Sequence, residues 1–229
     1  MFSGIIEARG RLVRNIPKGD FASVEISTSS IPERFRAGDS VSVDGVCLTV
    51  TREGDGKFSA EVGSETLNRT TLRSWRLGRS VNLETPARLG SPLGGHLVQG
   101  HIDGITRVDG FFPEPGGKRL VLGMTAGFFP YIVEKGSVAL NGVSLTVTRA
   151  SPERFEVFLI PFTLRETNLG SLRRGTSVNV ELDLIGKYVE RWMAQSGRIP
   201  GLLTAPGLSD SPRIESKVET LTRNRSARS

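Results

Sequence analysis

The sequence predicts an all-β protein made of two tandem, homologous, six-stranded antiparallel β-barrels and a C-terminal α-helix. The first observation is an internal repeat. Residues 40–52 read SVSVDGVCLTVTR, and 97 positions later residues 137–149 read SVALNGVSLTVTR, with nine of 13 positions identical. The same offset brings residues 66–84 onto residues 163–181, with 11 of 19 identical. A period of this length suits a whole small domain, so the chain is a duplicated module.

The second observation is a hydrophobic period of two, which is typical of half-buried β-strands. Within residues 40–51 two alternating runs are separated by Asp44-Gly45, and Asn141-Gly142 takes the same place in the second copy. These dipeptides favour a type I′ hairpin, because both central residues of that turn need a positive φ. Short strands with Gly-bearing turns indicate an antiparallel barrel or sandwich, and the copy length favours six strands closed into a small barrel. Further predicted strands are 22–26, 58–62, 80–84, 120–124, 155–160 and 177–182.

Helical spacing is confined to a few segments. Residues 66–73 and 163–172 begin with Thr and carry Leu at helical spacing, so each copy is expected to hold a short helix or helical turn. A longer amphipathic helix is predicted over 184–195, with Asp183 at its N-cap. This helix lies outside both repeats, so we expect it to serve association rather than a barrel core. Its apolar face comprises Ile185, Tyr188, Val189 and Trp192.

The repeat also sets the predicted domain boundaries. We expect a first barrel over 1–96, a second barrel over 97–183, and the association helix over 184–196. Residues 197–229 contain many Ser, Thr and Arg residues without periodicity, and they are predicted to form a disordered tail.

Composition excludes several classes of function. The hydrophobic share of 37% and the charged share of 24% are ordinary for a globular protein of 229 residues. Half of the net charge of +6 arises after residue 196, and aromatic residues are only 7%, so no nucleic-acid partner is expected. A single cysteine, a start without a signal-peptide pattern and no apolar run near the ~18 residues of a membrane span favour a cytoplasmic protein without a membrane partner.

Candidate reactive residues are found where the two copies differ. The differing pairs are Cys47 with Ser144, Gly38 with Lys135, Pro86 with Asp183, and Ile5 with His101. Each has a structural alternative, since a lone cysteine is commonly a small buried apolar residue and Asp183 is placed to cap a helix. His96 and His101 also have a purely structural reading. Their spacing, with one cysteine elsewhere, matches no zinc site, and no nucleotide-binding or nucleophile-elbow motif is present.

Several motifs together resemble the riboflavin synthase family of the α-chain type. They are MFSGIIE, DGVCLTVT, NGVSLTVT, GGHLVQGHID, LIPFTLRETNLG and VNVELDLIGKYVERW, and the resemblance covers about residues 1–195. It implies Greek-key barrels that each bind one lumazine. It also implies the dismutation of two 6,7-dimethyl-8-ribityllumazine molecules by four-carbon transfer, giving riboflavin and 5-amino-6-ribitylamino-uracil without a cofactor.

The same resemblance implies an assembly. The expected form is a homotrimer held by the C-terminal helix, with the working site between the first barrel of one subunit and the second barrel of its neighbour. Lumazine synthase is a candidate protein partner.

Matching motif positions assigns substrate-binding residues to two pockets. The first is expected to contain Gly4, Ile5, Ile6, Cys47, Leu48, Thr49, Glu61, Val62, Gly63, Ser64, Glu65 and Thr66, and Ser40 is added to the substrate-binding set. The second is expected to contain Gly100, His101, Ile102, Lys135, Ser144, Leu145, Thr146, Phe158, Leu159, Ile160, Pro161, Phe162 and Thr163.

The implied reaction sets requirements on the catalytic side chains. One lumazine must lose a proton from its C7 methyl group, and His101, with a reference pKa of ~6.5, is the expected base. The other lumazine is attacked at C7, so Cys47 is expected to add there or to orient a nucleophilic water. Ser144 and Thr146 are expected to polarise the acceptor or to shuttle protons, with Asp183 assisting them.

One position departs from the family pattern, which commonly has Pro-Glu-Thr-Leu where this chain has Phe162 after Pro161. The first copy keeps the acid as Glu65. Two other functions stay open at this point, a non-catalytic lumazine- or flavin-binding protein and a purely structural double barrel. Retention of the whole reactive set favours the enzyme.

Overall fold

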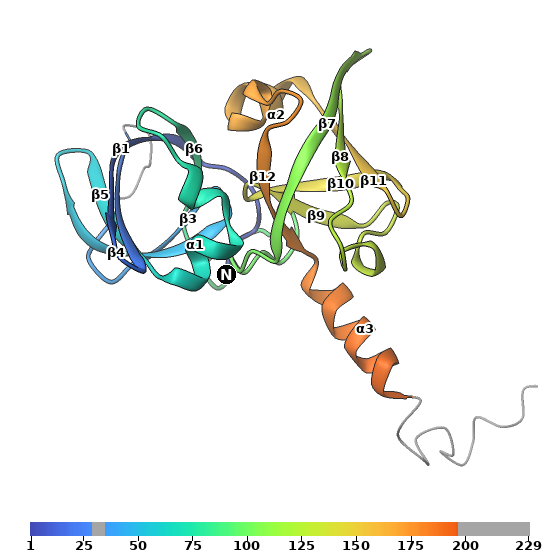
Figure 1. The fold of residues 1–229 in the computed structure, drawn as a ribbon, viewed down its shortest axis with the longest axis horizontal. Helices are drawn as coiled ribbons and strands as arrows, with labels where there is room; N and C mark the ends of the chain where they lie inside the picture. The colour runs from blue at the N-terminus through green and yellow to red at the C-terminus, as the bar shows by residue number, and fades with distance from the viewer. Residues whose placement is uncertain (29–34, 197–229) are drawn as a thin grey trace, which may run out of the picture. The chain divides into compact units, whose positions relative to one another are not determined.

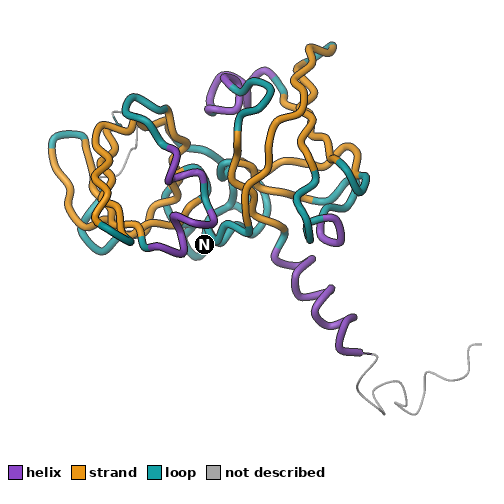
Figure 2. The backbone as a smooth tube through the Cα atoms, in the orientation of Figure 1, coloured by secondary structure: helices purple, strands orange, loops and turns teal. Residues whose placement is uncertain are grey.

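The computed structural model describes residues 1–28 and 35–196, and these form two closed six-stranded antiparallel barrels (Figures 1 and 2). The predicted fold class is therefore confirmed. The first barrel consists of β1 (Ala8–Lys18), β2 (Phe21–Ser27), β3 (Ser40–Val43), β4 (Val46–Gly54), β5 (Lys57–Val62) and β6 (Ser80–Glu84). The second consists of β7 (Gly104–Glu114), β8 (Gly117–Gly123), β9 (Ser137–Leu140), β10 (Val143–Ala150), β11 (Arg154–Leu159) and β12 (Ser177–Leu182).

The strands follow the same order in both barrels. Around the first barrel the order is β1-β2-β5-β4-β3-β6, and around the second it is β7-β8-β11-β10-β9-β12. Because β2 pairs with β5 rather than with β3, the β3–β4 hairpin is placed on the far side of β5, which is a Greek-key arrangement. Each strand thus has a counterpart six strands later.

The hydrophobic alternation in the sequence did not predict strands β1 and β7. Each has only one large or branched apolar residue facing inward, Leu12 in β1 and Val108 in β7, and the other inward positions are small or polar, so the period of two is weak in both segments. A register shift in each strand interrupts the period further. These two strands are defined by their pairing with neighbouring strands in the closed barrels.

Equivalent residues fill the two barrel cores. Phe58 and Phe155 stand 97 positions apart, and both are completely or almost completely buried. Leu72 and Leu169 have the same relation and are equally buried. Burying an aromatic or leucine side chain contributes roughly 1.5–3 kcal/mol each, so the repeat in sequence is a repeat of core packing.

Short helices lie between the last two strands of each barrel, overlapping the segments predicted to contain them. α1 (Ser64–Arg69) and the 3-10 turn η1 (Thr71–Ser74) belong to the first copy, and α2 (Pro161–Glu166) and η3 (Asn168–Ser171) to the second. Each predicted helix is split in two because Thr70 and Thr167 adopt extended conformations, and their hydroxyls accept bonds from the N–H groups two residues on. A third 3-10 turn, η2, spans Phe129–Tyr131.

The C-terminal helix α3 spans Leu184–Ser196. Asp183 caps it, because its Oδ1 accepts a hydrogen bond from the N–H of Ile185 at 2.9 Å. Five large apolar residues on this helix are exposed, namely Ile185, Tyr188, Val189, Trp192 and Met193. The predicted tail at 197–229 lies outside the described residues.

The two copies meet at their hairpin tips. Asp44, Gly45, Asn141 and Gly142 all have positive φ, as a type I′ turn requires. A Cβ added to either glycine would lie 2.7 Å from the backbone nitrogen of the other. The glycines therefore allow the two turns to touch, in addition to forming them.

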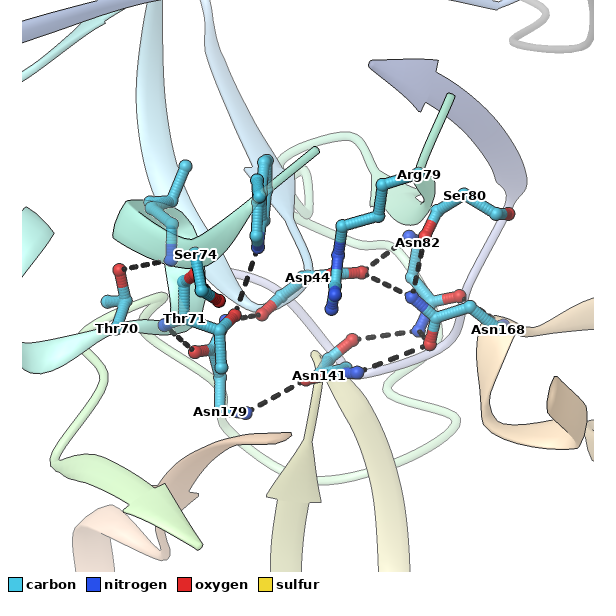
Figure 3. A network of polar contacts seen from close by, with 12 residues as sticks. Asp44, Thr70, Thr71, Ser74, Arg79, Ser80, Asn82, Asn141, Asn168 and Asn179 are labelled. Carbon is cyan, nitrogen blue, oxygen red and sulfur yellow. Dashed lines mark hydrogen bonds and ion pairs between the residues drawn. The ribbon is translucent and has the colours of Figure 1, made fainter. Parts of the chain in front are cut away.

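Two asparagines at matching positions join the barrels behind these tips (Figure 3). The side chain of Asn82 donates to the carbonyl of Asn141 at 2.9 Å and accepts from the N–H of Asn168 at 2.7 Å. Asn179 repeats the pattern from the other side, donating to the carbonyl of Asp44 and accepting from the N–H of Thr71, each at 2.8 Å. All four bonds cross between copies and are buried, so they fix the register of one barrel on the other.

Candidate functional site

The opening segment of each copy lies against the hairpin strand of the other copy. The N–H of Ser144 donates to the carbonyl of Gly4 at 2.8 Å, and the N–H of Cys47 donates to the carbonyl of Gly100 at 2.9 Å. A Cβ on Gly4 would lie 2.6 Å from the Cβ of Ser144, and one on Gly100 would lie 2.5 Å from the Cβ of Cys47. Both glycines also have φ near +80°, so only glycine fits these crossings.

The predicted grouping of these segments into pockets is wrong. Gly4, Ile5 and Ile6 were assigned to the Cys47 pocket, and Gly100, His101 and Ile102 to the Ser144 pocket, whereas the structure exchanges the two segments. Each surface therefore combines one barrel's hairpin strand with the other copy's opening segment. The two copies are so similar in sequence that neither pairing is distinguished without the tertiary contacts.

A cavity of about 410 Å³ brings Cys47 and His101 together. We call it the Cys47 cavity. The thiol is half-buried and the imidazole is exposed, so both are open to a ligand. Its lining comprises Val46, Cys47, Glu65, Thr66, Arg69, Thr70, Gly100, His101, Ile102, Asp103 and Lys187. Two residues assigned different roles in the reaction thus share one site.

A buried glutamate anchors each exchanged segment. Glu181 accepts from the N–H of Gln99 at 2.6 Å and of Gly100 at 2.9 Å, and Glu84 accepts from the N–H of Ser3 at 2.7 Å and of Gly4 at 3.0 Å. Burial raises the pKa of Glu181 to about 7, outweighing the lowering by these hydrogen bonds. Burial also raises the pKa of Glu84. Both were visible in the repeat as identical residues, but their anchoring role was not.

His96 was not predicted as a site residue, and the structure places it beside Ser144. Its Nδ1 lies 2.7 Å from the Ser144 Oγ, and its buried Nε2 has no hydrogen-bond partner among the residues that the structure describes. Burial lowers the pKa of His96, and the charge of Asp183 opposes that with a smaller effect. A neutral imidazole whose Nδ1 is unprotonated can accept a hydrogen bond from the serine hydroxyl in this position and polarise it.

The glycines before His96 give the signal that sequence reasoning missed. A Cβ on Gly95 would lie 2.7 Å from the Ser144 Cβ, so the segment approaches the serine closely only because residue 95 is glycine. The motif GGHLVQGH therefore delivers one histidine to each surface, His96 to Ser144 and His101 to the Cys47 cavity.

Strand alternation separates the predicted binding residues into two groups. Thr49 and Thr146 are exposed, each two residues beyond Cys47 or Ser144. Their strands alternate, so they share a face with the thiol or the hydroxyl. Four predicted residues on the strands are instead buried in the barrel cores, where they offer a ligand only backbone groups, namely Leu48, Val62, Leu145 and Leu159.

Lys135 has an unusual backbone conformation for a lysine. Its φ is +65°, while Gly38 at the matching position has φ of +96°, and both N–H groups bond at 2.8 Å to the equivalent carbonyl of the following strand. A left-handed conformation costs a residue with a Cβ about 1–2 kcal/mol. The second copy thus carries an exposed lysine at a position whose backbone suits glycine, as is common at functional sites.

Other predicted residues stand apart from the Cys47 cavity lining. Ser40 pairs with Thr49 across β3 and β4 but lines a separate cavity of about 210 Å³ with Asp39 and Pro86. Phe162 is 61% exposed, with the Arg165 guanidinium 5.4 Å from its ring centre. Phe162 is therefore available to a ligand as an apolar face with a nearby cation. The remaining predicted residues are Glu61, Gly63 and Ser64 around the start of α1, and Phe158, Ile160, Pro161 and Thr163 around the start of α2.

Comparisons with known proteins agree with this architecture. The lumazine binding domain model matches twice, at residues 3–86 and 99–183. The riboflavin synthase of Mycobacterium bovis is 44% identical over 201 residues, spanning 86% of this chain and all of that protein. The riboflavin synthase of Actinobacillus pleuropneumoniae is 40% identical over 193 residues, spanning 84% of this chain and 90% of that protein.

Solved structures are similar as well. The crystal structure of LumP with 6,7-dimethyl-8-(1'-D-ribityl) lumazine has a TM-score of 0.72 at 27% identity, covering 79% of this chain and 98% of that one. LumP complexed with riboflavin has a TM-score of 0.75 at 28% identity, covering 80% and 99%. The repeat, the exchanged segments and these matches define a protein of two lumazine-binding domains. The chain belongs to the riboflavin synthase family.

Proposed function

We propose that this chain converts two molecules of 6,7-dimethyl-8-ribityllumazine into riboflavin and 5-amino-6-ribitylamino-uracil by transfer of a four-carbon unit. One observation carries the proposal. The two copies build related surfaces by exchanging their opening segments, yet one surface carries a thiol and an exposed imidazole and the other a serine paired with a buried imidazole. Two identical substrates that must react differently require similar surfaces with unlike groups.

In the Cys47 cavity, His101 is the proposed base for the C7 methyl proton. Its imidazole is exposed and is the side chain that most often serves as a general base, so it can reach a proton of a bound ligand. Cys47 is proposed to add to C7 of a lumazine or to orient a water there. The backbone N–H of Cys47 donates to the Gly100 carbonyl, and this hydrogen bond positions the residue that carries the half-buried thiol.

At the other surface, Ser144 is proposed to polarise the acceptor. The hydroxyl is in hydrogen-bond contact with His96, and the Asp183 charge acts on that imidazole. Thr146 lies on the same strand face and is proposed to shuttle protons. Lys135 and Phe162 supply a cation and an apolar face to the lumazine. No step needs an external cofactor, since one lumazine is built up from the other.

We propose that the working assembly is a homotrimer held by α3. The support is the exposed apolar set on this helix, which a second and third copy of the chain would cover. The working site then lies between the first barrel of one subunit and the second barrel of its neighbour. Holding both lumazines there makes the reaction effectively intramolecular, which is worth roughly 7–11 kcal/mol of the barrier.

Two finer proposals concern the cell. The protein is proposed to act in the cytoplasm, where a thiol such as Cys47 stays reduced, and cell fractionation tests this. No helix among the described residues has both the length and the apolar character needed to span a membrane. Lumazine synthase is the proposed partner, tested by co-elution of the two purified proteins.

The deciding experiment supplies the purified protein with the lumazine alone and follows riboflavin by chromatography. We expect riboflavin and the uracil product in equal amounts.

Cys47→Ala and His101→Ala are expected to reduce turnover more than they reduce lumazine affinity. The control is Lys57→Met, at an exposed position, which should retain both the turnover and the lumazine affinity of the wild type.

A non-catalytic carrier is the alternative, and it is favoured by the likeness to LumP bound to riboflavin and the lumazine. Tight fluorescent binding without any riboflavin product would establish the carrier instead.

A further inference from the structure

Lys187 on α3 reaches the Cys47 cavity, although it belongs to neither repeat. It lines that cavity together with Cys47 and His101. Its Nζ lies 2.7 Å from Asp103 Oδ2, and both side chains are only 25% exposed. Asp103 is itself fixed, because its Oδ2 accepts from the N–H of Leu182 at 2.8 Å. The lysine is thus held by a short, partly buried ion pair at the cavity wall.

The first copy keeps the carboxylate of this arrangement but has no lysine at the matching position. Glu7 stands at the position that matches Asp103, and it binds Thr85 through that residue's hydroxyl at 2.8 Å and its N–H at 3.3 Å. The position matching Lys187 is Gly90, in an exposed turn. A cation at the exchanged segment is therefore a further difference between the two surfaces.

The cavity lining contains two cationic side chains that are always charged near neutral pH, Lys187 and Arg69, and of these Lys187 is the more buried. The other cation, Arg69, pairs with Glu65 on the exposed surface of α1, where solvent screens the pair. Behind the exchanged segment, Glu181 accepts hydrogen bonds from the backbone N–H groups of Gln99 and Gly100, and the Lys187 charge acts on it with a smaller effect than its burial does. The titratable and charged groups near Lys187 are Cys47, Glu65, Arg69, His101, Asp103, Tyr131, Glu181, Asp183 and Glu190.

We propose that the Lys187 ammonium group stabilises the anion that a lumazine in the Cys47 cavity forms when its C7 methyl group loses a proton. The inference rests on the proposed function. In this step the C–H bond breaks, His101 takes the proton, and the electron pair spreads over the methylene carbon and the ring. Negative charge develops in a partly buried site, where a fixed cation acts more strongly than in water. Asp103 moderates the effect by sharing the lysine charge.

The test follows the ionisation of bound lumazine by stopped-flow absorbance before turnover, since loss of the proton changes the conjugated ring. With the full chain in excess, we expect the wild type to lower the midpoint of this ionisation relative to free lumazine. Lys187→Met should raise the midpoint by about one pH unit, a tenfold loss in anion stability, and reduce kcat about tenfold with little change in KM. Lys187→Arg should keep the midpoint within a few tenths of a unit.

Asp103→Asn distinguishes a charge effect from a structural one. Its amide oxygen still accepts from Leu182, but the lysine charge is no longer shared, so the midpoint should fall below that of the wild type. Lys57→Met removes another ion-paired lysine, bonded to Glu25 at 3.9 Å and absent from the cavity lining, and should leave the midpoint in place.

Equal midpoints for wild type and Lys187→Met, or shifts in the same direction for Lys187→Met and Asp103→Asn, would overturn the proposal. Circular dichroism establishes that each variant is folded, and Lys187→Arg provides the test should the methionine variant unfold. Riboflavin formation is measured separately with the wild type. A lowered midpoint without riboflavin would reject the proposed activity and retain the role of Lys187.

Discussion

Two glycines decide where the reactive side chains of this protein stand. Gly4 and Gly100 each adopt a left-handed conformation and each lie against the Cβ of a proposed catalytic residue, Ser144 and Cys47 respectively. A side chain at either position would push the exchanged segment away from the opposite hairpin strand. The residue that brings His101 to Cys47 is therefore a glycine with no chemistry of its own.

Gly100→Ala should be strongly destabilising. The positive φ costs about 1–2 kcal/mol and the overlap with Cys47 about 1–3 kcal/mol more. Gly116→Ala is the matched control, since its φ is +83° but nothing lies within 4 Å of the added Cβ, so only the backbone cost applies. Urea unfolding measures both free energies, and equal losses would show that the Cys47 overlap is relieved without cost.

Glu181 makes the stability of the fold depend on pH. Its folded pKa of about 7 exceeds the ordinary value of 4.5, so the folded chain holds this proton more tightly than the unfolded chain does. The stabilising contribution is therefore complete below about pH 4.5 and is lost as the pH rises through 7. Across pH 5–8 the wild type should lose up to about 3 kcal/mol relative to Glu181→Gln. Urea unfolding at four pH values measures this, with Glu61→Gln as an exposed control, and parallel curves for wild type and Glu181→Gln would exclude it.

At the scale of elements, the β3–β4 and β9–β10 hairpins do two things at once. Their tips touch through Gly45 and Gly142, and their outer faces carry the thiol and hydroxyls of the two surfaces. Asn82 and Asn179 hold the tips from behind with four crossed hydrogen bonds (Figure 3). The packing of one hairpin on the other therefore sets the geometry of both surfaces.

Removing one of these asparagines should loosen the junction. Asn179→Ala leaves the Thr71 N–H and the Asp44 carbonyl buried without their partner, which should cost about 2–4 kcal/mol. Asn15→Ala is the comparison, because its single bond to the Trp75 carbonyl is 3.4 Å long and part-buried, so a loss below about 1 kcal/mol is expected. Thermal unfolding of both variants decides the matter, and a similar small loss in each would mean that water replaces Asn179.

At the scale of the whole molecule, the duplication suits a reaction of two identical substrates. The two copies form similar surfaces, so each can bind one lumazine in the proposed reaction. The exchanged segments place different side chains at the two surfaces. The proposed trimer brings the Cys47 surface of one subunit to the Ser144 surface of the next. Each working site is therefore formed by two chains, one contributing its Cys47 surface and the other its Ser144 surface.

Mixed assemblies test this arrangement. Cys47→Ala and Ser144→Ala chains should each be nearly inactive, yet unfolding and refolding them together should restore activity. Random assortment makes about a quarter of the interfaces fully wild type, so about a quarter of the wild-type rate is expected. Mixing without refolding is the control and should give no gain. Absence of rescue after refolding would place both surfaces of a working site within a single chain.

The sequence by itself established the duplication, the hairpin turns and most strands, and it proposed Cys47, His101 and Ser144 as reactive residues. These features are local, since alternation and turn chemistry are written in neighbouring residues and the repeat in a fixed offset. Strands β1 and β7 were not predicted, because small or polar residues occupy all but one of the buried inward positions in each and weaken the alternation. The pairing of segments escaped as well, because two nearly identical copies offer the same contacts in either arrangement.

Only the tertiary structure decided that Gly100 and His101 complete the Cys47 cavity, that His96 serves Ser144, and that Lys187 reaches the same cavity from α3. Each of these contacts joins residues about 50 to 140 positions apart in the chain. Such contacts are set by how two closed barrels pack on each other, through touching glycines and crossed asparagine bonds. That packing is a property of the folded surfaces, which no local pattern of residues records.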